Sequence, residues 1–342
     1  MVRLLRHLFT FAALVAAPLA WSQAAPAAKA PPALPASPAV AAPPLASPAA
    51  TPAPSTTSTQ IAPAATEAAS PLAAKSFLWE VKSKTNTVYL FGTVHVGKNS
   101  FYPLPDTVEN AFADSAKLVV EADITNQQAI TESAPLMMYT PPASLENQVS
   151  PAVLQRLKKY AAANQMPYDA LKSLKPFLLG GLLVLTEFAK QGYDQRYGVD
   201  GYLIQKAVLK AKPVVELESV GEQMKMLAGL NRQEQEAFLD NALSTVERGK
   251  AALQIEGMIA AWQSGNAAMM ESTVKLANEG MKMTAALDEK VLYGRNAKMA
   301  VKVEEFLRGD EKHFVAIGSM HLVGKRGLVD VLKAKGYEVK QL

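Results

Sequence analysis

Short apolar runs of strand character lie toward the two ends of the folded region, and helical patterns occupy most of the sequence between them. The runs are rich in valine, leucine, isoleucine and phenylalanine, and they cover residues 77–82, 87–91, 117–121, 214–218 and 314–317. Their length and composition predict buried strands. The short separation of the first two runs predicts a hairpin. Strands that alternate with helices elsewhere along the chain predict an α/β fold.

Two of these runs end in the same short pattern. Gly-x-x-His occupies residues 92–95 and again 318–321, each time followed by apolar residues and a closing glycine. After each copy come a loop, a helical pattern and another strand, at 117–123 and at 337–340. The repeat is imperfect, because the second copy has no acid at the place of Glu121. We expect a central mixed, partly parallel sheet built from these two strand–helix–strand units.

Helical periodicity dominates residues 124–195 and 222–308, which predicts a large helical insertion between the sheet-forming segments. Residues 171–190 are apolar enough to suggest a membrane span. However, Lys175 and Glu187 bound an apolar stretch shorter than the 20 or so residues that a bilayer requires. A buried core helix is therefore favoured at this place.

Polar residues mark the expected starts of several helices. Asp106 and Ser150 each precede a helical pattern and are expected to cap it, and a further helix is expected to start at Ser219. Pro151 directly follows one of them, at the first helical position that proline favours.

The N-terminal part of the chain has a different composition. Residues 1–24 have a basic start, a short apolar core and a small-residue exit, which predict a secretory signal peptide, with an uncleaved anchor as the alternative. Residues 25–74 are mostly alanine and proline, which predicts a disordered tether, with a proline-rich recognition segment as the alternative. A single folded domain is expected over 75–342, in a periplasmic or secreted protein.

Composition narrows the range of functions. The chain has 35 basic and 31 acidic residues, and no basic run interleaved with aromatic residues, so nothing indicates nucleic-acid binding. It has no cysteine, which excludes disulfides and thiolate metal ligands. Beyond the signal segment, no stable membrane span is expected.

Polar residues that can do chemistry follow the predicted strands. His95, Glu121, Glu218 and His321 stand at or just beyond strand ends, where open α/β sheets bind their ligands. Two imidazoles with one or two carboxylates suit zinc, manganese, cobalt or ferrous iron. We expect a divalent metal held by His95, His321 and Glu121. The alternatives are ordinary buried histidines, Asp123 in place of Glu121, and a loop salt bridge for Glu218.

Arg295 is a further candidate, on the long helix before the last histidine-bearing strand, with Asn296 beside it. Its guanidinium can bind a substrate carboxylate or hold an acidic residue by a bidentate contact, whereas the alternative is an arginine on the helix surface. Asp200 and Tyr202 are weaker candidates of the same kind. His313 begins a strand at the opposite end and is expected to be structural.

Several segments together resemble the TraB/GumN family, which also includes PrgY and, more distantly, the Tiki metalloproteases. They are residues 91–97, 119–123, 198–202, 212–218, 295–296 and 318–322. The resemblance extends over about 77–342. It implies an α/β fold distantly similar to haem-binding ChaN, and divalent-metal-dependent peptidase activity in the Tiki branch.

The resemblance also implies roles for individual residues. The two family histidines fall on His95 and His321, and the family acid falls on Glu121. Glu218 and Arg295 match recurrent positions. Substrate choice does not carry over, because the central helices match only in general character.

These observations predict a metal-dependent hydrolase, most simply a peptidase acting on a peptide or protein. Its metal would activate water, Glu121 and Glu218 would serve as ligands or move the proton, and Arg295 would steady charge. One alternative is a non-catalytic binder of metal or haem in the cell envelope. Another is an accessory factor for surface polysaccharide or peptide signalling. The metal, the substrate and the oligomeric state stay open.

Overall fold

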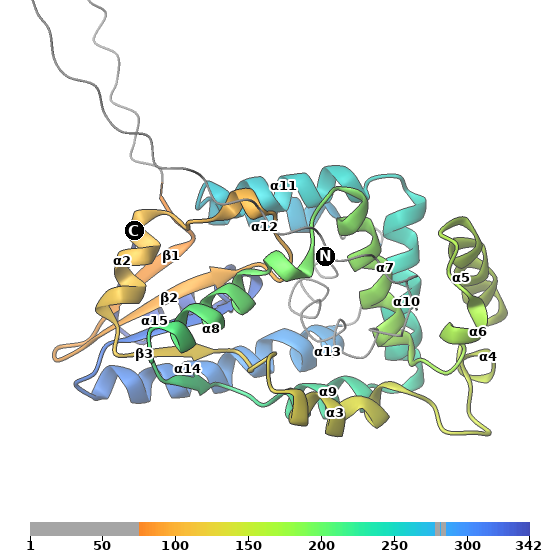
Figure 1. Cartoon of the computed structure of the whole chain (residues 1–342), viewed down its shortest axis with the longest axis horizontal. Coiled ribbons are helices and arrows are strands. Elements are labelled where there is room, and N and C mark those ends of the chain that lie inside the picture. Colours follow the sequence, from red (N-terminus) through yellow and green to blue (C-terminus); the bar gives the residue numbers. More distant parts are fainter. Residues whose placement is uncertain (1–74, 278–280, 282–284) are drawn as a thin grey trace, which may run out of the picture. The chain divides into compact units, whose positions relative to one another are not determined.

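A computed structural model describes residues 75–277, 281 and 285–342. Within these ranges the chain forms one six-stranded mixed sheet in the order β4-β3-β5-β2-β1-β6, accompanied by many helices (Figure 1). The predicted α/β class is confirmed. The predicted signal peptide (1–24) and tether (25–74) lie outside the described residues. None of the helices described is long and apolar enough to cross a membrane.

The strands fall where the apolar runs predict them. They are β1 (Leu78–Lys82), β2 (Thr87–Thr93), β3 (Lys117–Val120), β4 (Val214–Glu216), β5 (His313–Gly318) and β6 (Glu338–Gln341). β2, β5, β3 and β4 are parallel, whereas β1 pairs antiparallel with both β2 and β6. The predicted hairpin of β1 and β2 is therefore confirmed. Strand β5 is buried along its whole length, which explains its almost continuous apolar sequence.

The two Gly-x-x-His strands are direct neighbours. In the pairing of β2 with β5, Gly92 lies opposite Ile317 and Thr93 lies opposite Gly318. Because the strands are parallel, both histidine-bearing loops leave the sheet at the same edge. The residues that follow β3 and β4 leave at this edge too, and we call it the carboxyl edge.

The two strand–helix–strand units share an order of elements but not a pairing. The first runs from β2 through α2 (Asp106–Asp114) to β3, and the second from β5 through α15 (Leu328–Ala334) to β6. β3 is parallel to β5 inside the sheet, whereas β6 pairs antiparallel with β1 at the outer edge. The second unit therefore contributes only one strand to the parallel part of the sheet.

Helices occupy both segments of the predicted insertion, within the residues that the structure describes. In the first segment they are α3 (Gln127–Ser133), α4 (Leu145–Gln148), α5 (Pro151–Ala163), α6 (Tyr168–Leu171) and α7 (Pro176–Lys190). Helix α8 (Val199–Leu209) lies between this segment and β4. After β4 they are α9 (Val220–Ala228), α10 (Arg232–Glu247), α11 (Ala251–Gln263), α12 (Ala267–Ala277), α13 (Ala285–Asp288) and α14 (Gly294–Arg308). A π-helical turn, Glu289–Tyr293, joins α13 to α14. Figure 1 shows α7 and α10 on the side toward which β2 and β3 point.

The predicted cap at Ser150 and the predicted helix start at Ser219 are confirmed. The Ser150 hydroxyl accepts a hydrogen bond from a backbone N–H of α5, and Ser219 forms a reciprocal capping box with Glu222 in α9. The prediction for Asp106 is wrong, because Pro105 takes the cap position and Asp106 is the first helical residue. There its carboxylate still lies near the positive end of the helix dipole.

The apolar segment around residues 171–190 forms the buried helix α7, which packs against α10. At Gly180 a Cβ atom would lie 2.9 Å from a ring carbon of Phe238. The missing side chain therefore permits the close approach of the two helices. The prediction of a core helix rather than a membrane span is confirmed.

Aromatic side chains tie the helices to the strand that carries the first Gly-x-x-His. The Trp262 indole N–H, from α11, donates a hydrogen bond of 2.7 Å to the carbonyl of Gly92. The ring of Phe91 contacts the rings of Trp262 and Phe314. Gly92 is thus held from the helical side as well as from the sheet.

The start of α8 is anchored on the loop that follows β2. The N–H of Val199 donates to the carbonyl of Val94 over 2.9 Å. Gly198 lies so close to this loop that an added Cβ would be 2.6 Å from the carbonyl oxygen of His95. By contrast, a Cβ at Gly201 would meet nothing within 4 Å.

This contrast yields a matched pair of substitutions. Gly198→Ala is expected to lower the free energy of unfolding by about 1–3 kcal/mol, because backbone atoms must shift to admit the methyl group. Gly201→Ala is expected to raise it by up to about 1 kcal/mol, because alanine favours the helix. Urea denaturation of the two variants measures both effects. Equal stability of the two variants would contradict the close packing at Gly198.

Candidate functional site

The two histidines of the Gly-x-x-His patterns are oriented in the same way. Nδ1 of His95 donates to Oδ2 of Asp200 over 2.7 Å, and Oδ1 of Asp200 accepts from the Thr93 hydroxyl over 2.6 Å. Nδ1 of His321 donates to Oδ1 of Asn296, whose amide nitrogen donates to the backbone carbonyl of Arg326. An oxygen acceptor on Nδ1 leaves Nε2 as the coordinating nitrogen of a neutral ring.

Both Nε2 atoms are buried and have no hydrogen-bond partner among the described residues. His95 is 6% exposed and His321 is fully buried. Nε2 of His321 lies 3.7 Å from Oε2 of Glu121. Buried polar atoms in native proteins nearly always have a partner, so these two nitrogens mark a place for a ligand.

Glu121 follows β3 and connects the ends of several elements. Its Oε2 accepts from the Gly318 N–H, at the end of β5, over 3.2 Å. Its Oε1 accepts from Arg295 of α14 and, over 3.0 Å, from Gln223 of α9. The same Gln223 amide donates to Oε2 of Glu218 over 3.2 Å. One side chain of α9 therefore holds both carboxylates.

Arg295 is the cation between these carboxylates. Its Nε and Nη2 contact Oε2 of Glu218 at 2.9 and 2.8 Å, and Nη2 also pairs with Glu121. Its Nη1 donates to the carbonyl of Val291, within the π-helical turn, a distortion that is frequent at functional sites. Arg295 is buried, so the alternative of a surface arginine does not apply. Of the two predicted contacts, it makes the one with acidic residues.

The surroundings set different charge states for neighbouring groups. Burial alone would raise the pKa of Glu121, but Arg295, His321 and His95 outweigh it and lower that pKa to about 2. Burial lowers the pKa of His321 to about 3, so its ring is neutral near pH 7. Burial also opposes the charged form of His95, but the carboxylates of Asp200 and Glu121 together outweigh burial and raise the pKa of His95. An anionic carboxylate therefore lies between two differently tuned imidazoles.

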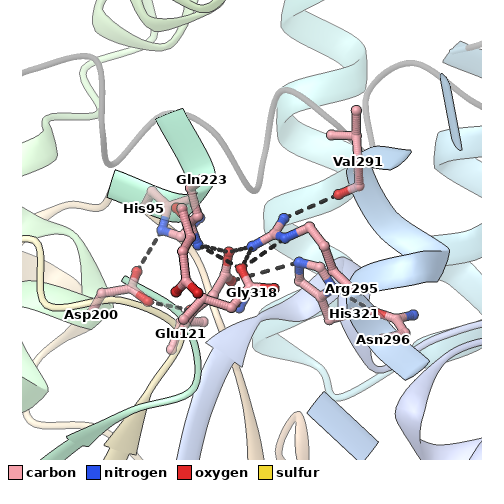
Figure 2. Close-up of polar contacts among 12 residues, drawn as sticks. His95, Glu121, Asp200, Gln223, Val291, Arg295, Asn296, Gly318 and His321 are labelled. Atoms are coloured by element: carbon pink, nitrogen blue, oxygen red, sulfur yellow. Dashed lines mark hydrogen bonds and ion pairs between the residues drawn. The ribbon is translucent and has the colours of Figure 1, made fainter. Parts of the chain in front are cut away.

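The carboxyl edge of the sheet thus gathers the predicted residues His95, Glu121, Glu218, Arg295 and His321. Figure 2 shows His95 and Asp200 on one side of the cluster, with Arg295, Asn296 and His321 on the other.

The remaining predicted candidates, Asp123, Tyr202 and His313, make their contacts outside this cluster. The Asp123 carboxylate accepts from the N–H and hydroxyl of Thr125, and Tyr202 donates to Glu109. His313 stacks on Phe306 at the start of β5, away from the carboxyl edge.

Sequence reasoning missed the contributions of Thr93 and Gln223, and it ranked Asp200 too low. Gln223 had one usable signal, because the Ser219 cap places it in the first turns of a helix that begins beside Glu218. The buried Ser319 hydroxyl, two residues before His321, also has no partner in the described part of the chain. No sequence pattern singled it out.

The residues of this centre meet some of the requirements of a metal site. Among the described residues, no group of three or more His, Cys, Asp and Glu side chains has the arrangement of ligands around an ion. Still, ligand atoms on one tetrahedral zinc are about 3.3 Å apart, close to the 3.7 Å between His321 and Glu121. The partnerless Nε2 atoms and their oxygen-held Nδ1 atoms also match the usual setting of ligating histidines. The donor types fit a divalent ion, with Glu121 now engaged by Arg295.

These features define a class of α/β protein in which two adjacent Gly-x-x-His strands present histidines to one buried polar centre. The chain belongs to the TraB/PrgY/gumN family, whose model matches residues 77–341. The resemblance seen in the sequence is confirmed.

Individual relatives are distant. The chain is 26% identical to the uncharacterized protein YbaP of Escherichia coli over 245 residues, which are 72% of this chain and 87% of YbaP. It is 24% identical to metalloprotease TIKI2 of Xenopus tropicalis, covering 78% of this chain and 59% of TIKI2. It is also 24% identical to metalloprotease TIKI1 of Homo sapiens, covering 78% of this chain and 61% of TIKI1. The chain spans about three fifths of these Tiki proteins. No solved structure matches it.

Removal of the buried cation tests its contribution to stability. Arg295→Met is expected to lower the free energy of unfolding by about 3–5 kcal/mol, because it leaves the buried Glu121 and the partly buried Glu218 without a counter-charge. Arg326→Met is the matched control, since it breaks an exposed pair with Glu289 and should cost less than about 1 kcal/mol. Urea denaturation near pH 7 gives both values. Similar losses in the two variants would contradict a structural role for the buried pair.

Removal of one carboxylate tests the tuning of His95. Asp200→Asn is expected to lower the pKa of His95, because the neutral amide no longer stabilises the imidazolium. Because the pKa of His95 is higher in the folded than in the unfolded protein, protonation of this residue stabilises the fold below pH about 6.5. This stabilisation is lost as the pH rises through the pKa of the folded state. Asp200→Asn should remove that contribution. Histidine resonances followed by NMR through a pH titration measure the change, with His313 as the internal reference. An unchanged His95 pKa in Asp200→Asn would contradict the conclusion that Asp200 raises it.

Proposed function

We propose that this protein is a secreted or periplasmic metal-dependent hydrolase, acting as a peptidase, with a divalent ion held by His95, His321 and Glu121. One observation carries the proposal. Two oriented histidines aim partnerless, buried Nε2 atoms into a centre where Glu121 Oε2 lies 3.7 Å from His321 Nε2. The names of the relatives TIKI1 and TIKI2 as metalloproteases support the reaction class.

Imidazole and carboxylate donors suit zinc, manganese, cobalt or ferrous iron, and the absence of cysteine excludes a thiolate site. When bound, such an ion supplies a water of lowered pKa and polarises a substrate carbonyl. Asp200 and Asn296 keep the two imidazole rings in the orientation that ligation requires.

The other residues of the cluster have roles that follow from their contacts. Glu218 contacts Arg295 and Gln223 through Oε2, and it is the carboxylate that would accept a proton from water during hydrolysis. Gln223 and Arg295 hold it at a constant position relative to Glu121. Arg295 also balances the negative charge of both acids, and it is the group that would stabilise the negative charge that develops during hydrolysis.

The proposal is tested by metal analysis of the purified full chain and by cleavage of a peptide library. Close to one equivalent of metal is expected, and chelation should abolish cleavage until metal is restored. His95→Ala and His321→Ala should each lower kcat/KM by more than about 100-fold, since loss even of a supporting residue costs about 10–100-fold. His313→Gln is the matched control, because it replaces a histidine away from the site and should retain metal and activity.

Two outcomes would reject the peptidase. One is a metal-free protein, and the other is cleavage that both histidine substitutions leave unchanged. A haem absorbance band without turnover would favour the alternative of a non-catalytic haem binder. A cellular phenotype that survives replacement of both histidines would favour an accessory factor for surface polysaccharide or peptide signalling.

A further inference from the structure

A surface groove of about 750 Å³ lies beside the candidate site, and no step of the proposed chemistry uses it. Its walls come from four segments. Asn99 and Tyr102 follow His95, Thr125 follows Glu121, and residues 195–197 together with the outer face of α8 complete the lining. The groove therefore borders the loops that carry the candidate ligands.

Helix α8 is shared by the groove and the site. Asp200 turns inward and holds His95, whereas the next two residues, Gly201 and Tyr202, line the groove. Successive helical residues point about 100° apart, so one turn of helix faces both places. Helix α8 therefore connects the groove to the residue that orients His95.

The groove has a rigid aromatic wall. The rings of Tyr102 and Tyr202 stack with centroids 4.2 Å apart. Their hydroxyls are both engaged, with the Tyr197 carbonyl at 2.8 Å and with Glu109 at 2.9 Å. Because both ends of each ring are held, the pair offers a preformed apolar surface at little entropic cost.

The lining is nearly neutral. None of its residues is a carboxylate, and its one charged side chain, Arg196, is paired with Asp194. Amide side chains, among them Asn99 and Gln205, supply hydrogen-bonding groups along it. Gly201 leaves open space where any other residue would project a side chain. This combination suits a large apolar side chain together with the peptide backbone that carries it.

We propose that the groove binds an extended peptide segment and receives one large apolar side chain, preferably aromatic, against Tyr102 and Tyr202. The proposal rests on the peptidase function proposed above and names the class of its substrate. Aromatic contact with the tyrosine pair provides the preference, and the amide side chains hold the backbone beside the site. A basic side chain bound here would have no carboxylate to pair with among the described lining residues.

The first experiment compares synthetic peptides that differ at a single position near the cleaved bond, with Phe, Leu, Gly, Asp or Lys there. Wild-type protein should cleave the Phe peptide with a kcat/KM about tenfold above that of the Gly peptide. The same peptides, fluorescently labelled, are bound to the His95→Ala/His321→Ala double variant. Fluorescence anisotropy then reports affinity when cleavage is absent, and the same order of preference is expected.

Substitutions at the groove provide the second experiment. Gly201→Leu should fill the open space and remove most of the advantage of Phe over Gly, while the Gly peptide is affected less. Tyr102→Leu should reduce the same advantage by loss of the aromatic wall. Leu253→Phe is the control, because Leu253 is 72% exposed on α11 and does not line the groove.

The outcomes separate this proposal from the function on which it rests. Cleavage with no preference among the peptides, or a preference unchanged by Gly201→Leu, would reject the groove as the substrate-binding site. The proposed peptidase activity would not be affected by this result. Selective binding of the Phe peptide that Gly201→Leu abolishes, without cleavage by wild type, supports the groove and rejects the peptidase. Binding of oligosaccharides in place of every peptide overturns the groove as a peptide site.

Discussion

A buried guanidinium between two carboxylates is the interaction on which the rest of this site depends. Arg295 contacts Glu121 and Glu218 at the carboxyl edge of the sheet, where Glu121 is buried and Glu218 is partly buried. Two carboxylates so close together repel each other in a medium of low dielectric. Arg295 removes this repulsion and keeps Glu121 anionic. It also determines where α14 must lie, and therefore where its neighbour Asn296 meets His321.

Three helices supply partners to the polar centre at the carboxyl edge. α8 brings Asp200 to His95, α9 brings Gln223 to both acids, and α14 brings Arg295 and Asn296. These contacts show that the three helices orient the polar side chains of the site in addition to packing against the rest of the fold. A sheet alone presents side chains at its strand ends, but it cannot also hold each imidazole from behind. The helices provide that second set of contacts, and α8 in addition forms a wall of the groove.

Residue patterns predicted the strand ends well, because a buried strand has a distinctive apolar sequence and a glycine at its end stands out. His95, Glu121 and His321 were selected on this ground, and the parallel pairing of β2, β5 and β3 brings their strand ends to one edge. Asp200 was ranked as a weak candidate because aspartate near a helix start is ordinary. Its importance comes from one contact with a residue 105 positions away, for which local sequence has no signal. The helix cap expected at Asp106 failed for a local reason, since Pro105 already held the extended conformation.

The sequence by itself determined the class of fold, the order of its elements, the two Gly-x-x-His turns and the family. These features depend on local composition and periodicity, which a linear chain records directly. Only the tertiary structure decided that Arg295 is buried between two acids and that Nε2 of His95 and of His321 has no partner among the described residues. It also decided that Gly201 opens onto a groove. The reason is physical: burial, charge pairing and open space are relations between segments far apart in the chain, and they exist only after the chain has folded.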